Sequence, residues 1–118
     1  MVRGGKKKIG EWGENLACAF LCRRGFKIIE RNYYTTVGEI DIVAKLGDDF
    51  YFVEVKTRRA GEMANDLAIT AEKWRRFEKT VGRYCCKHQI EGGIILAALI
   101  VAFDRVGGTV HFSLIPKY

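Results

Sequence analysis

The stretch GEIDIVAKLGDDFYFVEVKTR, residues 38–58, restricts the possible folds more than any other part of the chain. Two apolar segments flank Leu46-Gly47-Asp48-Asp49, and glycine and aspartate at these positions are typical of a hairpin turn. The pattern therefore predicts paired strands over 38–45 and 50–56. Such a hairpin needs further elements to cover its apolar side chains.

Four charged residues stand inside these segments, where strands usually carry core side chains: Glu39, Asp41, Glu54 and Lys56. Period-2 alternation predicts one shared face on each strand: Glu39, Asp41 and Val43 on the first, and Phe50, Phe52, Glu54 and Lys56 on the second. A buried carboxylate costs several kcal/mol unless it is paired or binds a metal. A purely structural hairpin gains nothing from that placement.

Asp41 and Glu54 can approach each other if their strands pair, and two close carboxylates repel until a divalent cation joins them. Oxygen ligands suit Mg²⁺ or Mn²⁺. Lys56 lies about 7 Å along the strand from Glu54, so it could orient or deprotonate a metal-bound water. The alternative is a solvated strand face, since charged pairs are common there. The apolar neighbours on both sides of Asp41 and Glu54 favour a functional site.

Apolar spacing indicates the remaining elements. We expect a helix over 9–24, a strand over 26–30, a polar connection over 31–37, a loop over 58–66, a helix capped by Thr70 and ending near His88, and strands over 94–103 and 109–115. This order predicts an α/β fold, a mixed β-sheet flanked by helices. We expect residues 1–8 to form a flexible basic arm and residues 9–118 a single domain.

The chain carries a formal charge of +6, and basic surfaces attract polyanions such as nucleic acid. Lys6, Lys7 and Lys8 in the arm could contact phosphates or serve only as a solubilising tail. No secretory signal is recognisable, and the longest apolar run, residues 94–103, is far too short for a membrane helix. We expect a cytoplasmic protein without a membrane partner.

The cysteines are Cys18, Cys22, Cys85 and Cys86. Gathered together, they could form a four-thiolate zinc site. Their arrangement as a helical pair and a vicinal pair differs from the usual zinc knuckles, which favours reduced thiols. Both interpretations remain open from the sequence.

Four motifs follow one another in a recognisable order: Gly10-Glu11-x-Gly13-Glu14-x-x-Ala17, Ile29-Glu30-Arg31-Asn32, Gly38-Glu39-Ile40-Asp41-Ile42-Val43-Ala44 and Phe52-Val53-Glu54-Val55-Lys56-Thr57-Arg58. In this order and spacing the chain resembles the YraN-like family of small bacterial proteins, from about Gly10 to Arg76. The family is assigned to the restriction-endonuclease-like PD-(D/E)xK fold, close to archaeal Holliday junction resolvases.

The resemblance implies a metal-dependent endonuclease acting on DNA, on branched or single-stranded structures. Asp41, Glu54 and Lys56 match its catalytic positions, and Glu14 matches the helix acid that joins Asp41 and Glu54 around Mg²⁺ or Mn²⁺. Glu14 could instead be an acid favoured by the helix dipole. A homodimer would suit an enzyme that cuts two strands symmetrically.

Nucleic-acid contacts are expected from Lys6, Lys7, Lys8, Arg58 and Lys73. Lys73 could equally belong to a solvated helix face, because Arg75, Lys79 and Arg83 repeat at helical spacing. The chain departs from the family at 97–99, where Ala-Ala-Leu replaces the common Arg-Phe-Asp. This departure keeps a second function open, a non-catalytic nucleic-acid-binding or adaptor module on the same fold.

Overall fold

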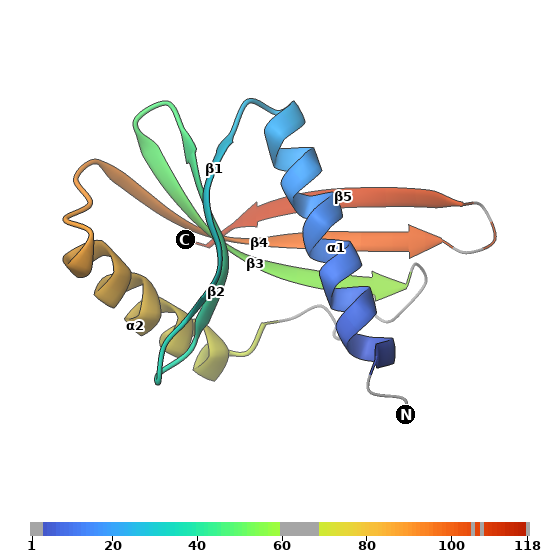
Figure 1. The fold of residues 1–118 in the computed structure, drawn as a ribbon, viewed down its shortest axis with the longest axis horizontal. Helices are drawn as coiled ribbons and strands as arrows, with labels where there is room; N and C mark the ends of the chain where they lie inside the picture. The colour runs from blue at the N-terminus through green and yellow to red at the C-terminus, as the bar shows by residue number, and fades with distance from the viewer. Residues whose placement is uncertain (1–3, 60–68, 105, 107, 118) are drawn as a thin grey trace.

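The computed structural model describes residues 4–59, 69–104, 106 and 108–117. Its elements are α1 (Gly4–Arg23), β1 (Lys27–Tyr34), β2 (Glu39–Leu46), β3 (Asp49–Arg59), α2 (Ala71–Lys87), β4 (Gly93–Asp104) and β5 (Thr109–Pro116). The fold is α/β: a five-stranded mixed sheet is flanked by the two helices (Figure 1). This arrangement confirms the expected fold class and is compatible with a restriction-endonuclease-like fold.

The strands lie in the sheet in their chain order, β1-β2-β3-β4-β5. β1, β2 and β3 form an antiparallel meander, β4 runs parallel to β3, and β5 returns antiparallel to β4. Parallel neighbours need a crossover connection, and α2 lies in the segment that joins β3 to β4. β1 and β5 are therefore the two edges of the sheet.

One face of the sheet is covered by α1, which crosses β3, β4 and β5 in Figure 1. Ala17 and Leu21 of this helix are fully buried in a cluster with Ile42, Val53 and Leu99. Farther along the same face, the rings of Phe20 and Phe112 stack with centroids 4.6 Å apart. These contacts fix the position of α1 relative to the central strands.

The other face packs against α2. Phe77, Val81 and Tyr84 of the helix lie in a buried cluster with Val43 and Phe52. The predicted start of this helix is confirmed, because the Thr70 hydroxyl caps it by accepting the Lys73 N–H at 3.1 Å. The helix ends at Lys87 with His88 as its C-cap.

Several boundaries differ from the expected ones. β3 continues to Arg59, so the first two residues of the loop expected over 58–66 belong to the strand, and the rest of that loop lies outside the described residues. Helix α1 begins at Gly4 rather than Ile9, so the backbone of residues 4–8 of the expected arm is helical. Residues 31–34, expected as a connection, continue β1, and Tyr33 pairs opposite Ile40. An edge strand tolerates polar side chains because one side faces water, which explains why the sequence pattern does not reveal this pairing.

The four cysteines do not form one site. Cys18 packs with the cluster under α1, whereas Cys85 packs with the cluster under α2, on the opposite face of the sheet. All four are free thiols. The zinc interpretation is therefore wrong.

None of the described helices is long and apolar enough to cross a membrane.

Candidate active site

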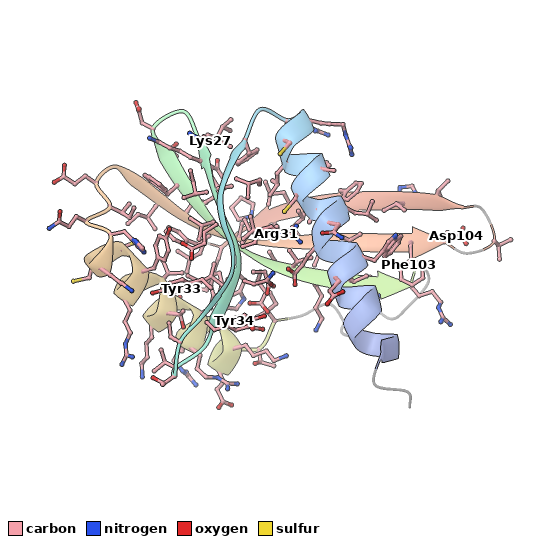
Figure 2. The ribbon with its side chains drawn as sticks, in the orientation of Figure 1. Lys27, Arg31, Tyr33, Tyr34, Phe103 and Asp104 are labelled. Atoms are coloured by element: carbon pink, nitrogen blue, oxygen red, sulfur yellow. The ribbon has the colours of Figure 1, made fainter. Side chains whose placement is uncertain are left out.

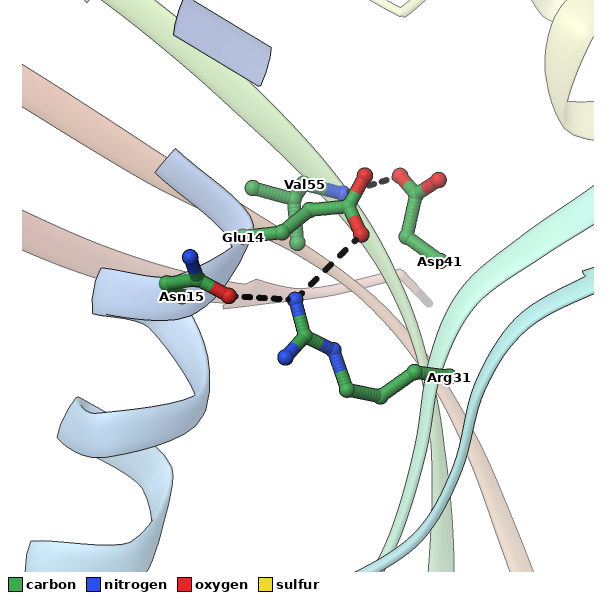
Figure 3. Close-up of polar contacts among 5 residues, drawn as sticks. All are labelled: Glu14, Asn15, Arg31, Asp41 and Val55. Atoms are coloured by element: carbon green, nitrogen blue, oxygen red, sulfur yellow. Dashed lines mark hydrogen bonds and ion pairs between the residues drawn. The ribbon is translucent and has the colours of Figure 1, made fainter. Parts of the chain in front are cut away.

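β2 and β3 part in the middle of the sheet, at the charged segment noted in the sequence. Their pairing runs from Leu46 opposite Asp49 to Ile42 opposite Val53, and no pair follows in the direction of Asp41. β3 nevertheless continues to Arg59 alongside β4. We call this opening the fork. At the fork, the Val55 N–H donates to Oδ2 of Asp41 at 2.7 Å (Figure 3). This bond to a side chain takes the place of a backbone hydrogen bond between the two strands.

The side-chain alternation of β2 breaks at Asp41. Ile42 lies in the cluster under α1, but both Ile40 and Val43 lie in the cluster under α2. The prediction that Glu39, Asp41 and Val43 share one face therefore fails at Asp41, because strict alternation assumes an unbroken strand pairing. Glu39 and Val43 do lie on the same side, the one covered by α2. The Asp41 carboxylate instead reaches along the sheet toward β3, as its bond to Val55 requires.

Asp41 is the most strongly perturbed acid at the fork. Its side chain is buried, with 9% of the residue exposed. Loss of water raises its pKa from 3.8 to about 7; the Val55 hydrogen bond opposes the rise, and repulsion from Glu54, Glu14 and Glu39 adds to it. A carboxylate in this environment favours a proton or a cation as a partner.

Glu54 approaches the fork from the side covered by α2. It lines a cleft together with Glu39 of β2 and with Lys73 and Arg76 from the start of α2. Desolvation and then repulsion from Glu39 raise the Glu54 pKa, while Lys73 and Lys56 lower it. β3 pairs with β4 without interruption, so its side chains alternate regularly. This agrees with the prediction that Phe52, Glu54 and Lys56 share one face of the strand.

Glu14 approaches from the opposite side, on α1. The helix can come close to β3 because residue 13 is glycine; a Cβ there would collide with the Thr57 side chain. Desolvation raises the pKa of Glu14, and the Arg31 guanidinium, whose Nη2 is 3.8 Å from Oε1, opposes this. Arg31 also donates to Oδ1 of Asn15 at 2.9 Å (Figure 3).

The structure brings Asp41 within electrostatic reach of both Glu14 and Glu54, but those two lie on opposite sides of the fork. Among the described residues, no three His, Cys, Asp or Glu side chains are grouped to hold one metal ion. Glu39, which the sequence marked as a strand charge but not as a site residue, interacts with all three carboxylates. Its position two residues before Asp41 is the signal that could have identified it.

The residues expected to contact nucleic acid fall into three groups. Lys73 is exposed beside the Glu54 cleft, as a phosphate contact requires. Arg58 is buried, at 8% exposed, so its guanidinium is withdrawn from the surface. The side chains of Lys6, Lys7 and Lys8 lie outside the described part of the chain.

The Ala97-Ala98-Leu99 segment is buried in β4, and Ala98 pairs with Glu54. Ala98 therefore places only a methyl group at the β4 position that neighbours Glu54.

Comparison with known proteins places these residues in a family. The model of the uncharacterised protein family UPF0102 matches residues 13–107. A UPF0102 protein of Dictyoglomus turgidum is 42% identical over 85 residues, which cover 71% of this chain and 72% of the relative. A UPF0102 protein of Thermotoga petrophila is 44% identical over 79 residues, covering 67% and 72%. The matched range includes the fork and the residues around it.

Proposed function

This chain belongs to the UPF0102 family, the YraN-like proteins whose motifs it shares, and on that premise we propose that it is a metal-dependent endonuclease acting on DNA. The observation that supports this most is the buried Asp41 carboxylate in the fork, which interacts with the carboxylates of Glu54, Glu14 and Glu39. We further propose that the fold belongs to the PD-(D/E)xK superfamily. In this assignment Asp41 is the first acid, and Glu54 and Lys56 form the E-x-K element.

The donor chemistry fits Mg²⁺ or Mn²⁺. Mg²⁺ usually binds one or two protein carboxylates and keeps several waters, so it does not need three grouped acids. Asp41 and Glu54 would hold the ion, and Glu14 would support Asp41 from the other side of the fork. The bound ion would lower the pKa of a water and neutralise charge that develops on the phosphoryl group.

The chain's own residues prepare that chemistry. The Val55 N–H holds Oδ2 of Asp41 by a hydrogen bond. The other carboxylate oxygen, Oδ1, would then be the one that interacts with the neighbouring groups of the site. Lys56, which lowers the pKa of Glu54, would orient or deprotonate the attacking water. Lys73 and Arg76 line the same cleft and would contact the DNA backbone in a sequence-independent, salt-sensitive way.

The test is cleavage of labelled four-way junction, flap, single-stranded, duplex and RNA substrates with Mg²⁺ or Mn²⁺. Asp41→Asn and Lys56→Ala should each abolish cutting. Asp48→Asn, in the exposed β2–β3 turn, and Lys87→Ala, at the exposed end of α2, are matched controls that should retain it. Cutting that survives both Asp41→Asn and Lys56→Ala would overturn the catalytic assignment.

A non-catalytic nucleic-acid-binding module is the second candidate. It is favoured by one observation, that no three potential metal ligands are grouped among the described residues. Binding without cutting, together with an unchanged melting temperature in Mn²⁺, would select this candidate, because an ion bound by the native state must stabilise it. A cytoplasmic location and a homodimer remain predictions, and gel filtration tests the second.

A further inference from the structure

A second cleft opens beside the fork, between α1 and the edge strand β1. It is lined by Gly10, Glu11, Glu14 and Asn15 from the helix and by Arg31, Asn32 and Tyr34 from the strand. Figure 2 shows Arg31 and Tyr34 on the side of β1 that faces α1. β1 is the outer strand of the sheet among the described residues, so the cleft lies at the edge of the sheet.

Tyr34 presents an aromatic ring in this cleft. It is 68% exposed, whereas its neighbour Tyr33 packs against Tyr84 with ring centroids 4.9 Å apart. Adjacent tyrosines thus have different environments: Tyr33 packs against the core, and Tyr34 is open to solvent. An exposed aromatic face in a cleft is a platform on which nucleic-acid bases stack.

Polar groups surround this ring. Arg31 is held between Asn15 and Glu14, with its Nη2 2.9 Å from Oδ1 of Asn15. Asn32 has a positive φ of 53°, an uncommon backbone conformation outside glycine that asparagine tolerates better than most residues. The Asn32 side chain also lowers the pKa of Glu14. These contacts keep an amide, a guanidinium and a carboxylate beside the same open space.

The charge of the cleft favours a base over a phosphate. Glu11 and Glu14 both line it, and carboxylates repel a phosphate group but accept hydrogen bonds from the exocyclic amines of bases. Glu14 also interacts electrostatically with Asp41, so the cleft adjoins the fork. A nucleotide with its base in the cleft would therefore place its phosphate beside Asp41, where the divalent ion of the proposed function would offset the repulsion.

We propose that the cleft between α1 and β1 binds an unpaired base of a DNA strand, stacked on Tyr34, next to the phosphate at the fork. This rests on the proposed function for its substrate class and extends it by naming the strand structure preferred. A paired base in a duplex has both faces stacked and cannot offer one to Tyr34. Strand ends, flaps and junctions with unpaired nucleotides are the substrates that fit.

The test measures binding without cleavage, by fluorescence anisotropy in EDTA. The probes are a labelled single strand and the same strand with abasic sites, which has identical phosphates but no bases to stack. Wild type should bind the intact strand about 5- to 100-fold more tightly. Tyr34→Leu should remove this preference, whereas Tyr34→Phe should keep it, because it retains the ring.

A second variant tests the cleft without changing Tyr34. A Cβ at Gly10 would meet no atom within 4 Å, and Gly10 lines the cleft, so Gly10→Leu should fold normally and extend its side chain into the cleft. It should reduce the preference for the intact strand. Equal binding of intact and abasic strands by wild type, or a preference that survives both Tyr34→Leu and Gly10→Leu, would overturn the proposal. A preference without any cleavage in Mg²⁺ would instead support it while removing the nuclease assignment.

Discussion

Asp41→Asn is the change that most directly tests the electrostatics of the fork. Asparagine keeps a carbonyl oxygen that can accept the Val55 N–H, and it removes the charge that burial and the neighbouring carboxylates disfavour. In metal-free buffer, the variant should therefore be more stable than wild type at high pH. The expected direction is opposite to the usual destabilisation by a mutation at a buried site.

The magnitude follows from the pKa. Below 3.8 the Asp41 carboxyl is protonated in both folded and unfolded chains, and its contribution to stability does not change with pH. Between 3.8 and about 7 the unfolded chain loses the proton while the folded protein keeps it, so stability falls as pH rises. Each pKa unit corresponds to about 1.4 kcal/mol, so the full cost above this range is about 4 kcal/mol.

The assay is thermal unfolding of wild type and Asp41→Asn in EDTA, at about pH 4.5 and about pH 8.5. With about 4 °C per kcal/mol, the variant should melt up to roughly 15 °C above wild type at the higher pH and close to it at the lower pH. Asp48→Asn should show no such change, since Asp48 is exposed in a turn. A wild-type-to-Asp41→Asn difference that is the same at both pH values would refute this reasoning.

Three further predictions concern the surrounding structure. Gly13→Ala should lower the unfolding free energy by about 1–3 kcal/mol through collision with Thr57, whereas Gly10→Ala, in open space, should raise it by up to about 1 kcal/mol; chemical denaturation measures both. Thr70→Ala should cost about 1 kcal/mol by the same measurement, and Thr70→Ser should restore most of it. Desolvation and the Glu30 carboxylate raise the Tyr84 pKa to about 12, so ultraviolet titration against Tyr84→Phe should show one late-ionising tyrosine.

Most of the fold could be predicted from the sequence because its signals are local. The turn chemistry of residues 46–49, the Thr70 cap and the apolar run of β4 each act within a few neighbouring residues. The second half of β1 could not, since residues 31–34 show no apolar alternation and are ordered by pairing with β2. An edge strand carries too weak a pattern to be distinguished from a connection.

The candidate site could be predicted in its residue types but not in its geometry. Asp41 and Glu54 stand out because a charge inside an apolar strand is costly. The direction of Asp41 depends on where β2 leaves β3, and only the assembled sheet determines that. Tyr34 gains its importance from neighbours on α1, so inspection of the chain alone does not single it out.

The hydrogen bond from Val55 to Asp41 also makes one backbone amide a spectroscopic reporter. Its proton resonance should move whenever Asp41 gains a proton, binds an ion or loses its place between the strands, because each event changes the acceptor at 2.7 Å. Val53, paired with Ile42 in the regular ladder, provides the reference signal. Nitrogen-edited NMR of these two amides could therefore follow the state of the fork in the intact protein, without a substrate and without a mutation.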